Sequence, residues 1–207
     1  MINFDKLTLH VRLSLLNDHR NLWWLSVAEP LFSIINRQRE LLNQLENEEG
    51  SEDRYWEEVG NTEEIIGMLM VCCQTAFQRC LSEVAEWSTP RLEVGQLWKL
   101  GSCFDNGHSK AELINALANY YKHEGEWDKA AVMNALASGG PAPKDLKRQV
   151  RIAKVIRDCK IDMASNKVLY DGANLLLGDQ VVPDSLGEIF AAWHDNLKCR
   201  LGLDDVG

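Results

Sequence analysis

Three polar residues near the end of one helical pattern have the chemistry to act on a phosphate. They are Asn119, Lys122 and His123, within the stretch "LANYYKHEGEW". At about 100° per residue, His123 lies about 40° from Asn119 on a helix and Lys122 about 60° to the other side. Histidine moves protons near neutral pH, lysine neutralises a phosphate, and an amide orients a hydroxyl. RNA carries its own 2′-hydroxyl nucleophile, so these are candidate catalytic residues for cleaving RNA without a metal.

A structural interpretation of the same residues stays open. A histidine in the last turn of a helix is stabilised by the helix dipole and can bond the last carbonyls without any catalytic role. Asn119 and Lys122, taken singly, are ordinary surface residues. The aromatic residues around them, which end in Trp127, are more typical of a packed cluster than of a platform for stacking bases.

A second candidate surface lies on the amphipathic segment 144–159. Its apolar residues share one half of the helical wheel and its positive residues share the other. On a chain with a formal net charge of −9, such a face is a candidate to contact RNA, an acidic partner, or the chain's own acidic run at 46–58. The candidate nucleic-acid-binding residues are Lys147, Arg148, Arg151 and Lys154.

Two capped helices are expected to position the catalytic candidates. Asn61 and Glu64 form a reciprocal capping pattern that opens a long helix, which runs to about residue 87. Its apolar residues lie on more than one side of the helix, so we expect it to be the central buried helix. Ser109, with Glu112 as its reciprocal partner, caps the helix that carries the motif.

The rest of the chain predicts a mainly α-helical bundle with a small β element. Residues 7–15 alternate as a strand does, although a helical pattern through Leu7, Val11 and Leu15 also fits. Residues 21–45 have a helical pattern, which Pro30 should kink or divide. "KVLYDGANLLLG" predicts a hairpin that turns at residues 171–172 and could pair with the N-terminal strand.

"SGGPAP", residues 138–143, predicts a hinge between two parts of the chain. We expect residues 1–138 to form a helical core bundle that contains the motif helix 109–123. Residues 139–207, which include a last helix at about 185–201, are expected to form a C-terminal helical extension packed on the same core.

Composition limits the classes of function. A chain of 207 residues is long enough for one domain with its own core, and its acidic balance argues against coating nucleic acid or membrane through bulk charge. The longest apolar run, 65–73, is about half of a bilayer span, and no secretory signal is recognisable. The six cysteines have the spacing of reduced core thiols. We expect a cytoplasmic protein with no metal centre, no cofactor and no membrane partner.

A long buried helix, followed by a capped helix that ends in a polar residue and a histidine, resembles the HEPN superfamily (higher-eukaryote-and-prokaryote nucleotide-binding) over roughly residues 20–127. The resemblance implies an all-α and often dimeric fold. Many members are metal-independent RNases, while others are non-catalytic. The family motif is an arginine, four to six residues and a histidine at the dimer interface. Here Asn119 stands before His123 with three residues between them, so Lys122 would supply the missing cation.

Two functional hypotheses follow. The first is an RNA-directed protein of a phage-defence or toxin–antitoxin system, which acts as a homodimer and has RNA or a cognate antitoxin as its partner. The second is a non-catalytic interaction protein, such as an immunity or antitoxin-like inhibitor. Its acidic run at 46–58 would mimic nucleic acid toward a basic toxin.

Overall fold

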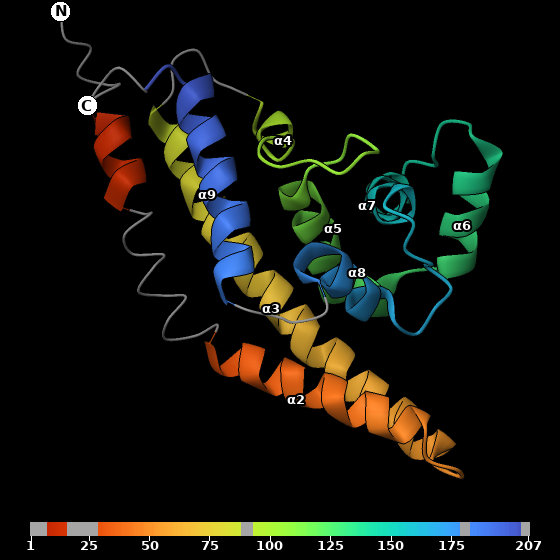
Figure 1. Ribbon diagram of the computed structural model, residues 1–207. Helices are drawn as coiled ribbons and strands as arrows, with labels where there is room; N and C mark the ends of the chain where they lie inside the picture. Colours follow the sequence, from red (N-terminus) through yellow and green to blue (C-terminus); the bar gives the residue numbers. More distant parts are fainter. Residues whose placement is uncertain (1–7, 16–28, 88–92, 179–182, 204–207) are drawn as a thin grey trace, which may run out of the picture.

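The computed structural model describes residues 8–15, 29–87, 93–178 and 183–203 of the chain (Figure 1). Within these ranges every regular element is helical, and the one trace of β structure is an isolated bridge between Cys103 and Ser109. The predicted mainly α-helical class is therefore confirmed for the described residues, and the predicted β element is not found among them. After a short helix at 8–15 come α2 (Glu29–Glu46), α3 (Glu52–Trp87), α4 (Val94–Leu97), α5 (Lys110–His123), η2 (Glu124–Glu126), α6 (Lys129–Ser138), α7 (Lys147–Asp158), α8 (Val168–Leu177) and α9 (Pro183–Arg200).

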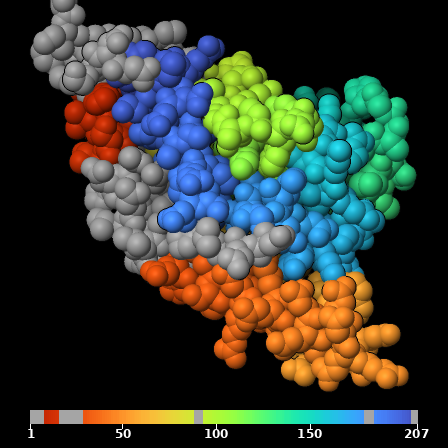
Figure 2. All heavy atoms as spheres, in the orientation of Figure 1, coloured from red at the N-terminus to blue at the C-terminus, as the bar shows by residue number. Residues whose placement is uncertain are grey.

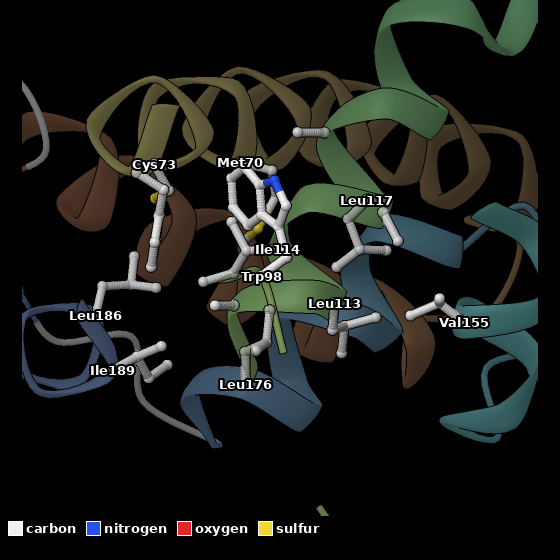
Figure 3. Close-up of a cluster of buried hydrophobic side chains, with 14 of the residues drawn as sticks. Met70, Cys73, Trp98, Leu113, Ile114, Leu117, Val155, Leu176, Leu186 and Ile189 are labelled. Atoms are coloured by element: carbon white, nitrogen blue, oxygen red, sulfur yellow. The ribbon is translucent and has the colours of Figure 1, made fainter. Parts of the chain in front are cut away.

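Helix α5 lies at the centre of the fold and packs against α3, α7, α8 and α9 (Figure 1). Figure 3 shows its Leu113, Ile114 and Leu117 between Met70 of α3 and Leu176 of α8. Small and branched apolar residues cover most of its circumference, so nearly the whole helix can be surrounded. Its buried positions are Ala111, Leu113, Ile114, Ala116, Leu117, Ala118 and Tyr120.

Helix α3 is the long buried helix that the sequence predicts, but it starts earlier. The structure begins it at Glu52, which places Asn61 inside the helix and makes most of the acidic run its first turns. Carboxylates are stabilised at a helix N-terminus by the backbone dipole, which explains why this run is helical. Among the described helices, α3 is the one long and apolar enough by composition to cross a bilayer, a test that buried core helices also pass.

The predicted N-terminal strand is wrong, because residues 8–15 are helical. The alternative interpretation as a helix is right, but the described residues on which it rested do not form the buried face of that helix. Leu9 and Leu13 enter the core, while Val11 and Leu15 are about half exposed. Alternation of apolar residues cannot separate the two structures when every second residue is apolar, since i and i+4 then satisfy both periods.

The predicted C-terminal hairpin is also wrong. Residues 168–177 form α8, and Asp171-Gly172 lies inside this helix instead of in a turn. Gly172 lies against Leu117 of α5, and a Cβ there would come within 2.5 Å of the Leu117 Cδ1 atom. The glycine thus serves close helix packing.

The ends of the other predicted helices agree better with the structure. Pro30 lies in the first turn of α2, where a proline costs no helical hydrogen bond. The part of the predicted helix before residue 29 lies outside the described residues. Helix α9 buries Phe190 and Trp193 as expected, and one apolar core cluster includes residues from both sides of position 139.

His108, which lies just before α5, connects the start of α5 to the end of α7. Ser109 caps α5 by accepting from the Glu112 N–H at 3.0 Å, as predicted. The Glu112 carboxylate does not complete the reciprocal cap, because it pairs with His108 Nδ1 at 2.8 Å. His108 Nε2 lies 3.4 Å from Asp158 at the end of α7. This pairing fixes α7 beside α5.

Glu63 of α3 caps the first turn of α8. Its carboxylate accepts from the N–H of Leu169 at 2.9 Å and from the N–H of Tyr170 at 2.5 Å. Burial raises the pKa of Glu63 from 4.5 to about 7, although the two N–H groups act to lower it. Glu124 and Asp171 nearby add repulsion that raises it further. The Glu63 carboxyl, which connects α3 to the start of α8, therefore changes its charge near neutral pH.

The close contact between α3 and α5 predicts opposite effects at two glycines of the same helix. A Cβ on Gly67 would lie 2.2 Å from the ring of Tyr121, while nothing lies within 4 Å of one on Gly60. Gly67→Ala should lower the free energy of unfolding by about 1–3 kcal/mol through overpacking. Gly60→Ala should raise it by about 0.5–1 kcal/mol through helix propensity. Urea unfolding would measure both, and equal effects would contradict the packing at Gly67.

Glu63 predicts a pH-dependent stability difference. Because the folded-state pKa is raised, the contribution of Glu63 to stability is fully present below its ordinary pKa and is lost as pH rises through about 7. Glu63→Gln keeps an acceptor for α8 but cannot titrate. The stability of the native chain relative to this variant should therefore fall between about pH 5 and pH 8, as measured by denaturant midpoints. A difference that does not change with pH would contradict the raised pKa.

Candidate functional site

The catalytic candidates lie on a partly exposed edge of α5. Asn119 and His123 are half-buried on this edge, and Lys122 is exposed. The buried face of the helix packs into the core, so the polar residues are forced to this side. The predicted placement of His123 in the last turn of the motif helix is confirmed.

Arg148 of α7 joins two of the three candidates. Its Nη2 donates to Asn119 Oδ1 at 2.9 Å and lies 3.2 Å from His123 Nε2. Asn119 and His123 are thus linked through a guanidinium that comes from another helix. Residue 148 was predicted to be a nucleic-acid contact, and the structure places it beside the predicted catalytic pair.

The contacts of His123 select one tautomer of its neutral ring. A guanidinium has only donors, so His123 Nε2 can bond Arg148 only as an acceptor. His123 Nδ1 lies 3.2 Å from Glu126 Oε2, a carboxylate oxygen that accepts. The ring therefore carries its proton on Nδ1 and directs the Nε2 lone pair to the surface beside Arg148. Because Arg148 occupies the one Nε2 lone pair, the ring can take a proton from a bound hydroxyl once the guanidinium turns to another acceptor.

Lys122 is held by a different group, on α3. Its Nζ donates to Gln74 Oε1 at 2.6 Å, and Gln74 Nε2 donates to Asn115 Oδ1 at 2.7 Å. Gln74 is 1% exposed, so its amide is fixed by these bonds. Asn119 Nδ2 bonds the same Asn115 side chain at 3.1 Å. Partial burial, and then the charge of Arg148, lower the pKa of Lys122.

These bonds form one polar network across three helices. It runs from Lys122 through Gln74 and Asn115 to Asn119, and then through Arg148 to His123. Because Asn119 donates into the network, its Oδ1 is left to face Arg148. The network fixes which polar atoms of α5 face the surface.

The sequence did not reveal this network. Arg148 is 25 positions from His123 and Gln74 is 48 positions from Lys122, so no local spacing relates them. The amphipathic pattern of α7 put Arg148 on its polar face, but could not say which neighbour that face meets. A polar residue among the apolar positions of α3 was the only signal for Gln74.

The other predicted nucleic-acid contacts extend the site along α7. Lys147, Arg151 and Lys154 are exposed, while the opposite face of α7 is buried. Among the residues that the structure describes, no ion pair connects this face with the acidic run at 46–58. The positive face is therefore open to an outside anion.

The aromatic residues beside the site form a packed cluster. Tyr120 and Trp127 are buried and meet edge to face, with ring centroids 5.3 Å apart. The Tyr120 hydroxyl donates to Glu124 at 2.8 Å, and burial raises the pKa of Tyr120 to about 12. Lys129 Nζ bonds the same carboxylate at 2.6 Å. These rings close the end of α5 and offer no face for stacking bases.

No protein-family model, curated protein or solved structure matches this chain. Within the described residues, no three histidine, cysteine or acidic side chains are grouped in a way that could hold a metal ion.

The network predicts the tautomer of His123. In ¹⁵N NMR of the imidazole, the neutral ring should carry its proton on Nδ1. Arg148→Ala should shift the population toward the Nε2–H form, because the donor that holds the Nε2 lone pair is lost. Lys147→Ala, a change of the adjacent exposed residue, serves as the control. A native ring protonated mainly on Nε2 would show that the contact with Arg148 does not form in solution.

Proposed function

We propose that this chain is a HEPN-like, metal-independent endoribonuclease of a defence or toxin–antitoxin type system, which acts as a homodimer in the cytoplasm. The observation that supports it most is the contact of Arg148 with His123 and Asn119. In the HEPN motif an arginine accompanies the histidine. Here the arginine comes from α7 rather than from the motif helix, and Lys122 is held elsewhere.

The arrangement suits the attack of a 2′-hydroxyl on the adjacent phosphorus. As the RNA binds, Arg148 turns from the His123 Nε2 lone pair to the phosphoryl oxygens, and His123 Nε2 then accepts the hydroxyl proton as the 2′-oxygen bonds to phosphorus. The bond from phosphorus to the 5′-oxygen breaks, which leaves a cyclic 2′,3′-phosphate and a 5′-hydroxyl end. Arg148 stabilises the charge that develops on the phosphoryl oxygens, and Asn119 orients Arg148 through its Oδ1 atom.

A dimer would supply the group that completes this reaction. The leaving 5′-oxygen needs a proton from the side opposite the nucleophile, which one histidine cannot reach in the same step. In a two-fold pair of motif helices, the partner's His123 would donate it. The exposed positive residues Lys147, Arg151 and Lys154 would hold the flanking phosphates of the RNA strand.

RNA cleavage in the presence of chelator tests this proposal. The purified chain should cut single-stranded RNA to cyclic phosphate ends, and His123→Ala should slow cleavage by about 10²–10⁴-fold. Arg148→Ala should slow it by about 10²–10³-fold through lost charge stabilisation. Arg37→Ala, an exposed arginine on α2, should leave the rate unchanged.

Two results would overturn the proposal. Cleavage at the native rate by folded His123→Ala would remove this helix from the reaction. Absence of cleavage by the folded native chain would favour the non-catalytic alternative, an immunity or antitoxin-like protein that binds through its acidic surface.

A further inference from the structure

A second surface of the molecule has the features of a binding site. Helices α2 and α3 meet at a turn that protrudes from the rest of the molecule at the lower right of Figure 2. A cavity of about 460 Å³ lies at this turn, and we call it the tip pocket. This volume is within the range of sites that hold a side chain or a small ligand. Its polar and aromatic lining comes from Glu46, Glu48, Glu49, Glu52, Tyr55 and Trp56.

The turn that shapes the tip pocket is held by its own hydrogen bonds. The one hydroxyl proton of Ser51 is shared between the carbonyls of Leu45, 2.5 Å from Oγ, and Glu48, 2.7 Å from it. The Tyr55 N–H donates to the Ser51 carbonyl at 2.8 Å. Gly50 has a φ of +81°, which only glycine adopts without strain. The walls of the pocket are therefore preformed.

The aromatic side of the tip pocket, Tyr55 and Trp56, is already in contact with one cation of the same chain, Lys167. Tyr55 and Trp56 meet edge to face at 5.3 Å. Lys167 bonds the Tyr55 hydroxyl, and its Nζ lies 4.8 Å from the Tyr55 ring centroid and 5.8 Å from that of Trp56. Lys167 approaches closest to Tyr55, and Trp56 is still 51% exposed. An exposed indole beside carboxylates is a favourable surface for a second cation.

The charges around the tip pocket restrict the partner to a cationic one. Four glutamates line the pocket against the single ammonium of Lys167. Three further acidic residues of the same run, Asp53, Glu57 and Glu58, outweigh its one arginine at position 54, so the net field stays negative. Nucleic acid and anionic membrane are repelled by such a surface. Arginine fits better than lysine, because its planar guanidinium stacks on an indole while it donates to carboxylates on two sides.

We propose that the tip pocket binds an arginine side chain of a basic partner protein, stacked on Trp56 and hydrogen-bonded to the surrounding glutamates. This goes beyond the proposed nuclease function, because the tip pocket shares no residue with the site on α5 and α7. The two activities can therefore fail or succeed separately.

The experiment uses the full chain and two peptides, Gly-Arg-Gly-Arg-Gly-Arg-Gly and its lysine counterpart, measured by calorimetry and by the indole N–H resonance of Trp56. The arginine peptide should bind about tenfold more tightly than the lysine peptide and should shift this resonance. Trp56→Ala should weaken binding of the arginine peptide about tenfold or more, and Trp56→Phe should weaken it less. Trp56 is exposed, so folding should be preserved, and circular dichroism checks it.

A pair of charge-matched variants separates the tip pocket from the general negative field. Glu48→Gln with Glu49→Gln removes two carboxylates that line the pocket, while Asp53→Asn with Glu57→Gln removes two from the same run that do not. The first pair should weaken binding about tenfold and the second about twofold. Equal losses from both pairs, equal binding of the two peptides, or an unchanged affinity of Trp56→Ala would each overturn the proposal.

Discussion

Close packing around α5 is the constraint on which the rest of the structure depends. Two glycines on neighbouring helices, Gly67 of α3 and Gly172 of α8, let the backbones approach Tyr121 and Leu117 so closely that a single Cβ would collide with either. In a core packed to this density, burying a polar group without a partner is unfavourable. Most polar residues of α5 therefore lie along one edge of the helix, from Glu112 to His123.

That confinement creates the candidate site. The edge carries Asn119 and His123, and α7 is fixed beside it at its other end by the pairing of His108 with Asp158. Arg148 thereby comes into contact with both residues. Buried Gln74 adds a second anchor from α3. The site is thus assembled from three helices. Apolar packing supplies most of the free energy that positions them, because exposed polar contacts contribute little net stability, and the pairing of His108 with Asp158 sets the place of α7 at one end of α5.

Two separate regions of the described structure carry concentrated charge of opposite sign. The positive face of α7 extends from the candidate site, while the carboxylates gather at the turn between α2 and α3. If these regions paired with one another, neither would be available to a partner. Their separation allows one molecule to hold an anion on one surface and a cation on another, which accounts for a strongly acidic chain that carries a basic helix face.

The sequence by itself determined the helical class, the long buried helix, the cap at Ser109 and the two faces of α7. These follow from local periodicity and from capping chemistry, which involve residues a few positions apart. It failed at residues 8–15, where alternating leucines satisfy both periods, and at Asp171-Gly172, where a glycine chosen for helix packing looks the same as one chosen for a turn. Only the tertiary structure decided that Arg148 meets His123 and that Lys122 turns to Gln74. Those contacts depend on how whole helices pack against one another. The residues that meet are 25 and 48 positions apart in the sequence, so no local sequence pattern indicates that they are in contact.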